Sequence, residues 1–151
     1  MIVAAGPATA RVYWRSMGTW AIVRFLHVAA AAIWLGMQVA LFVLVPALRR
    51  MLPPERVREV VRAAGMRLAI VAAVALPIIA ITGVALGRHE EAAAEHPGVV
   101  HLKQALLVAV VAILVGHGLV PGRRARIAAS VLMLVLTLTA VYAGTWLTAA
   151  G

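Results

Sequence analysis

Cysteine is absent from this chain of 151 residues. Its absence excludes disulfides, thiolate zinc sites, iron–sulfur clusters and thiol redox chemistry. It also excludes copper sites that are built on a thiolate ligand. The absence of cysteine does not by itself indicate a cellular compartment.

Acidic residues are scarce as well: the chain has five, against fourteen lysines and arginines. Hydrophobic residues make up 64% of the chain, and the mean hydropathy is +1.01. A soluble domain of this length cannot bury that much apolar surface, so we expect the lipid bilayer as solvent and partner. The net charge of +9 does not indicate a nucleic-acid partner, because the basic residues stand at the ends of apolar runs.

Four apolar stretches can cross a bilayer core of about 30 Å, which takes about 20 helical residues. They are residues 20–48, 68–86, 99–120 and 127–147. We therefore predict an all-α fold, in which residues 1–151 form one integral membrane four-helix bundle.

Two prolines and one basic segment should affect where these helices bend and end. Pro46 should bend or end the first helix, and Pro77 should bend the second. The basic, amphipathic segment 49–67 should extend one of them into the membrane interface. Residues 1–18 place apolar before basic residues, the reverse of a signal peptide, so we predict a retained tail or an interfacial helix.

The arginines predict the orientation in the membrane. By the positive-inside rule, the first and third connections between helices should be cytoplasmic. Both termini should then face outside, and we expect this to be the periplasmic side of a bacterial inner membrane. The arginines that decide this are Arg49, Arg50, Arg56, Arg58, Arg62 and Arg67 in the first connection and Arg123, Arg124 and Arg126 in the third.

Charged and strongly polar residues inside the spans are costly in lipid, so each is a candidate functional residue. The helical rise of about 1.5 Å per residue places His27 and His101 at one level in the outer half of the membrane. The helical repeat places Lys103 and His117 on one face of the third helix, with His101 nearly opposite. The candidates are Arg24, His27, Gln38, Arg67, His101, Lys103 and His117.

Some polar residues have simpler expected roles. We expect Gln38 to form a hydrogen bond to a neighbouring helix and Trp34 to pack in the core. The fourth helix carries a weakly polar stripe of Ser130, Thr137, Gly144 and Thr148.

His27 is a candidate haem ligand. A neutral imidazole binds iron without adding charge, which suits a site at membrane depth. Arg24 and Lys103 would then pair with the haem propionates. The alternative is that His27 hydrogen-bonds a neighbouring helix while Arg24 extends to the lipid head groups.

Three stretches resemble helices of the CopD-like superfamily of four-helix membrane proteins. The first is VRFLHVAAAAIWLGMQVALFVL, where a basic residue and two apolar residues precede His27, and Trp34 and Gly36 follow. The second is MRLAIVAAVALPIIAITGVALG, with its Thr-Gly pair near the outer end. The third is HLKQALLVAVVAILVGHGLVPGRR, which ends in a basic loop.

The superfamily includes the copper-resistance D domain and the HemJ-type protoporphyrinogen oxidases. The third stretch opens with His101 and Lys103, as the HemJ branch does, but His117 comes about one turn later than the HemJ pattern has its second histidine. The HemJ branch oxidises protoporphyrinogen IX with bound haem b, and the CopD branch is associated with copper uptake across the inner membrane. The resemblance therefore implies that His27 binds haem and that Lys103 is an essential, catalytic cation.

Three functions remain open. The first is a haem b membrane protein that acts as an oxidoreductase on a porphyrin or quinone, with His27 as one axial ligand. The third is a non-catalytic small subunit or scaffold of a larger membrane complex. The expected protein partners are a second copy of this chain or such a complex. In the first function the second axial ligand would be His101 or His117, and the carboxylates of haem or substrate would be bound by Lys103, Arg24 and Arg67.

The second function is a copper uptake or resistance permease. Histidine and methionine are soft enough to bind Cu(I). His89, His96 and His101 would capture the ion outside, and His27 would pass it inward. Against this, Met37 lies about 90° from the face of His27.

The connection GRHEEAAAEHPGVVHLKQ, residues 87–104, carries three of the five histidines. If it is helical, His89 and His96 are about 10 Å apart along the axis and cannot hold one ion together. If it is a loop, these histidines and a glutamate could converge on a divalent metal. We favour a solvated connection whose end, at His101 and Lys103, forms the rim of a cofactor pocket.

Overall fold

The computed structural model describes residues 7–89, 94–116 and 122–150, which contain helices and no strand. The four helices are α1 (Pro7–Met51), α2 (Pro54–His89), α4 (Pro97–Gly116) and α5 (Arg123–Ala150). All four are long and apolar enough to cross a membrane. The expected all-α fold with four candidate spans is therefore confirmed.

The helix ends follow from local chemistry. Proline fixes φ and lacks an N–H, so it suits the first position of a helix, and both α2 and α4 begin with one. Gly122, directly before α5, has a φ of 86°, a left-handed conformation that glycine adopts without strain. Between α1 and α2 the break is short, with the Leu52 N–H donating to the Leu48 carbonyl at 2.9 Å.

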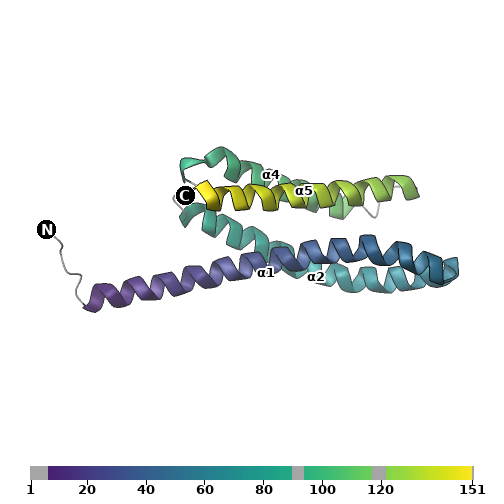
Figure 1. The fold of residues 1–151 in the computed structure, drawn as a ribbon, viewed down its shortest axis with the longest axis horizontal. Coiled ribbons are helices and arrows are strands. Elements are labelled where there is room, and N and C mark those ends of the chain that lie inside the picture. The colour runs from purple at the N-terminus through teal and green to yellow at the C-terminus, as the bar shows by residue number, and fades with distance from the viewer. Residues whose placement is uncertain (1–6, 90–93, 117–121, 151) are drawn as a thin grey trace.

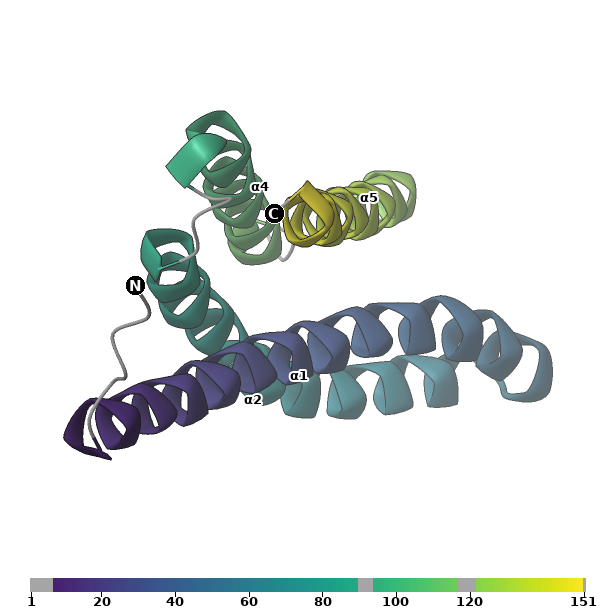
Figure 2. The same cartoon turned by 60° about the vertical axis from the view of Figure 1, so that its left-hand side comes forward.

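The segment 49–67 extends both helices, since α1 runs to Met51 and α2 starts at Pro54. Pro46 lies inside α1 and does not end it. Pro77 likewise lies inside α2. Part-way along its length, α2 changes direction away from α1, as expected for a helix that contains a proline (Figures 1 and 2).

The helices form two hairpins, α1 with α2 and α4 with α5, and contacts are most extensive within each hairpin (Figure 2). Across the hairpins, α1 contacts α5 and α2 contacts α4. Each helix therefore touches two neighbours, which is compatible with a four-helix bundle. The arginine end is where α1 ends and α2 and α5 begin, and the His–Trp end is where α2 ends, α4 begins and α5 ends (Figure 1).

The candidate spans are Gly18–Met51, Pro54–His89, Pro97–Gly116 and Arg124–Leu147. Large apolar side chains such as Phe25 and Ile81 are exposed on the outside of the chain. Such a surface suits lipid rather than water, so the chain is a multi-pass membrane protein.

All four helices meet in one core layer. Its buried residues are Trp34 of α1, Ala72 and Leu76 of α2, and Val110 of α4, and partly buried Met133 of α5 packs against them. Trp34 is only 2% exposed, so its expected packing role is confirmed. This layer lies near the middle of the α1 span, and it fixes the levels of the polar residues described next.

Candidate functional site

A buried polar cluster joins the two hairpins at the core layer. Trp34 Nε1 donates to Thr137 Oγ1 at 3.2 Å, and Gln38 Nε2 donates to the same oxygen at 3.0 Å. The Thr137 hydroxyl donates its own proton to the Met133 carbonyl at 2.8 Å. One proton and two lone pairs are the whole capacity of a hydroxyl, so Thr137 is fully used.

This cluster confirms the expected interhelical hydrogen bond of Gln38. It also fixes the amide orientation, because Thr137 has no second proton to give to an amide oxygen. Gln38 Oε1 is buried and has no hydrogen-bond partner among the residues that the structure describes. The sequence signal for Thr137 was its place in the weakly polar stripe of the fourth helix, but its role as a double acceptor was not foreseen.

His27 projects from α1 towards α2. Its Nδ1 lies 2.9 Å from Thr82 Oγ1. The Thr82 hydroxyl donates its single proton to the carbonyl of Ile78, one turn earlier in α2. The hydroxyl oxygen must therefore accept a hydrogen bond from Nδ1–H of His27. In this tautomer Nε2 carries the lone pair that can accept a hydrogen bond or bind a metal.

Gly83 allows this close approach of α1 and α2. A Cβ at position 83 would lie 3.1 Å from Cε1 and 3.6 Å from Nδ1 of His27. The Thr82–Gly83 pair thus provides an acceptor and room at adjacent positions. The hydrogen bond from His27 to a neighbouring helix, given above as the alternative to haem ligation, is therefore present, and it involves only Nδ1 of the ring.

Lys103 lies half-buried on α4, against α5. A Cβ at position 144 would lie 3.4 Å from the Lys103 Nζ and 3.8 Å from its Cε. Gly144, another member of the weakly polar stripe, thus leaves space for the ammonium group. The ammonium group is therefore held inside the bundle, where charge is costly without polar partners.

His27 and Lys103 lie at the same level of the bundle. The hydrogen bond between Trp34 and Thr137 places these two residues at the same height along the bundle, and α1 and α5 run in opposite directions. His27 precedes Trp34 by seven residues, and Gly144 follows Thr137 by seven. Both positions are therefore about 10 Å from the core layer, towards the His–Trp end.

The other candidate residues are less enclosed. His101 is exposed on α4, on a different side of the helix from half-buried Lys103, as the helical repeat predicts. Arg24 and Arg67 are also exposed. His117 lies outside the residues that the structure describes. The structure thus brings His27 and Lys103 to one level, and the expected choice between His101 and His117 as a second histidine stays open.

Two histidines at the His–Trp end pair with tryptophans. His89 stacks on Trp20, with ring centroids 3.8 Å apart and an angle of 8° between the planes. His96 meets Trp146 edge-on at 5.0 Å. The first pair links α1 to α2, and the second links the residue directly before α4 to α5. Over the described ranges 7–89, 94–116 and 122–150, no three His, Asp or Glu side chains form a group that could hold a metal ion.

The chain matches no protein-family model, no curated protein and no solved structure. Membership in the CopD-like superfamily therefore stays a prediction.

Two residues, His27 and Lys103, determine the chemistry that is available at their shared level of the bundle. His27 carries a nitrogen lone pair on a ring that a hydrogen bond to Thr82 orients, and Lys103 carries a positive charge. The first can bind a metal ion or accept a proton, and the second can bind a carboxylate. Both residues come from helices that are long and apolar enough to cross a membrane.

Proposed function

We propose that this chain is a haem b-binding protein of the bacterial inner membrane, of the CopD/HemJ-like type, in which His27 would bind the haem iron. The observation that carries the proposal is the hydrogen bond from His27 Nδ1 to Thr82 Oγ1. Histidines that bind metals almost always donate their other ring N–H to a protein acceptor or water. Thr82 supplies that acceptor in a part of the membrane where water is scarce.

The residue types fit haem better than a bare ion. Haem already supplies four nitrogen ligands to its iron, so the protein needs to add only one or two histidines. A bare copper ion needs most of its ligands from side chains. Copper uptake therefore remains the alternative, and no contact among the described residues favours it.

Lys103 has a separate role in this proposal. Its ammonium group, at the level of His27, would bind a carboxylate of haem or of a porphyrin substrate. Arg24, three residues before His27 on α1, would bind a second carboxylate. Arg67 has no such position, because it lies exposed on α2, beyond the core layer towards the arginine end.

When bound, haem would supply one-electron redox chemistry. The residues of the chain would do three things. His27 would hold the iron, Thr82 would keep the imidazole in the ligating tautomer, and Lys103 would orient a carboxylate. We propose a porphyrin or quinone as the substrate class, with both termini in the periplasm and the arginine end in the cytoplasm, as the positive-inside rule predicts.

The test is an optical absorption spectrum of the purified protein, oxidised and then reduced, from cells supplied with haem. We expect a haem b spectrum that disappears in His27→Ala. His89→Ala is the matched control, because it removes an imidazole that stacks on Trp20 and should leave the spectrum unchanged. A featureless wild-type spectrum, or a spectrum that survives in His27→Ala, would refute the proposal.

A further inference from the structure

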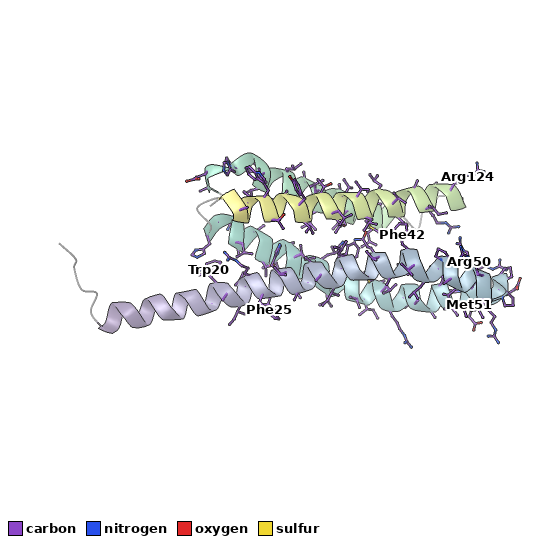
Figure 3. The ribbon with its side chains drawn as sticks, viewed as in Figure 1. Trp20, Phe25, Phe42, Arg50, Met51 and Arg124 are labelled. Carbon is purple, nitrogen blue, oxygen red and sulfur yellow. The ribbon has the colours of Figure 1, made fainter. Side chains whose placement is uncertain are left out.

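Arginines gather at one end of the bundle. Figure 3 shows Arg50 and Arg124, from different hairpins, at this arginine end. Two glutamates, Glu55 and Glu59, are the only described acids there, so positive charges exceed negative ones by five. The exposed arginines of this end whose side chains the structure describes are Arg49, Arg50, Arg56, Arg58, Arg62, Arg124 and Arg126.

These arginines fall into two classes. Arg56 lies 2.9 Å from the Glu59 carboxylate, and Arg58 lies 3.5 Å from the Glu55 carboxylate, so these two are paired within α2. The rest form no hydrogen bond or ion pair with any residue in the described part of the chain. The unpaired arginines are Arg49, Arg50, Arg62, Arg124 and Arg126.

Helix stability does not account for the arginines of α5. The carboxyl end of a helix is partly negative, so Arg49 and Arg50, in the last turn of α1, lie where the helix dipole favours cations. The amino end is partly positive, and Arg124 and Arg126 lie at the start of α5, whose first turn holds no acid. Their charges oppose the helix dipole, so an anion bound from outside the chain would stabilise this end of α5.

The membrane boundary supplies such an anion. The α1 span ends at Met51 and the α5 span begins at Arg124, so this end of the bundle lies where the apolar core meets the lipid head groups. An arginine side chain can bind a phosphate through two parallel N–H donors. Clusters of four to eight basic residues at the edge of membrane helices are typical of sites for anionic lipids.

We propose that Arg124 and Arg126 of one hairpin, and Arg49 and Arg50 of the other, bind the head groups of anionic phospholipids at the arginine end. The paired arginines, Arg56 and Arg58, take a smaller part because Glu59 and Glu55 lie beside them. Neither set of arginines depends on haem for this role.

The experiment is native mass spectrometry of the full chain, released from detergent with equimolar phosphatidylglycerol and phosphatidylcholine. We expect the wild-type protein to retain phosphatidylglycerol preferentially. The double variant Arg124→Gln/Arg126→Gln should lower this affinity roughly tenfold or more, since each interfacial arginine contributes about fivefold.

The matched control is Arg56→Gln/Arg58→Gln, which removes the same number of charges. We expect its affinity for phosphatidylglycerol to fall by less than about threefold, because these arginines are already paired. Equal losses in the two double variants would mean that net charge alone attracts the lipid, and this would overturn the proposal. Equal retention of both lipids by the wild-type protein would overturn it as well.

Discussion

The Nδ1 of His27 and the Thr82 hydroxyl meet across the α1–α2 interface at 2.9 Å. The hydroxyl proton is already donated to the Ile78 carbonyl, so this contact selects the imidazole tautomer with its proton on Nδ1. A hydrogen bond between neutral side chains in a membrane contributes only about 0.6 kcal/mol on average. The significance of the pair therefore lies in the orientation of the ring rather than in the stability of the fold.

Replacing Thr82 with valine should allow the His27 imidazole to adopt either neutral tautomer. We expect ¹⁵N NMR of the wild-type protein to show a protonated Nδ1 and an unprotonated Nε2 on His27. In Thr82→Val we expect a mixture of tautomers and a loss of about 0.5–1.5 kcal/mol in the free energy of unfolding. Thr82→Ser should restore the wild-type spectrum, and an unchanged tautomer in Thr82→Val would contradict the assigned hydrogen bond.

Gly83 should be intolerant of even one methyl group. A Cβ there would lie 3.1 Å from His27 Cε1, so Gly83→Ala must displace the ring. We expect the thermal unfolding midpoint in detergent to fall for Gly83→Ala. Gly36→Ala is the control, because nothing lies within 4 Å of a Cβ at that position. Alanine favours helix more than glycine by about 1 kcal/mol, so the control should be neutral or stabilised.

The number of helices could be predicted from the sequence, but their full lengths could not. Windows of about 20 apolar residues show where a chain crosses lipid. They do not show where backbone hydrogen bonding stops, and α2 begins at Pro54 rather than at residue 68. Pro46 likewise did not predict the end of a helix, because α1 continues past it to Met51 although proline disfavours helix interiors.

Within the candidate site, the depth of each side chain in the membrane could be predicted from the sequence, but its hydrogen-bond partner could not. The rise per residue places His27 and Lys103 at similar depths, because each level depends on one helix only. The partner of His27 depends on how α1 and α2 are rotated and shifted against each other. That register depends on how residues of different helices, such as Trp34 and Ala72, pack in the core layer, which no periodicity within a single helix reveals.

Gly144 should tolerate a methyl group but not a branched side chain. A Cβ at this position would lie 3.4 Å from the Lys103 Nζ, at the edge of ordinary van der Waals contact. Gly144→Ala should therefore leave the unfolding midpoint within a few degrees of wild type, whereas Gly144→Val should lower it and displace the ammonium group. Thermal unfolding of both variants checks this, and equal midpoints would show that Lys103 does not lie against α5.

Thr137 should be the most sensitive polar residue of the bundle. Thr137→Val keeps the side-chain shape but removes the acceptor shared by Trp34 Nε1 and Gln38 Nε2. Two buried donors are then left without partners, which should cost about 2 kcal/mol or more in the free energy of unfolding. The control is Thr139→Val, whose hydroxyl is exposed and bonds only to the Val135 carbonyl, and which should change stability by less than about 0.5 kcal/mol.

A double-mutant cycle isolates the cluster from general effects of the substitution. Gln38→Leu removes one donor together with the unpartnered Oε1, so it should cost less than Thr137→Val. In the combined variant the Thr137 substitution leaves only Trp34 without a partner, so the two losses should not add. The free energy of unfolding in a detergent titration measures each term. Strict additivity would show that Gln38 and Thr137 do not share a hydrogen bond, which would leave Trp34 Nε1 as the α1 donor to Thr137.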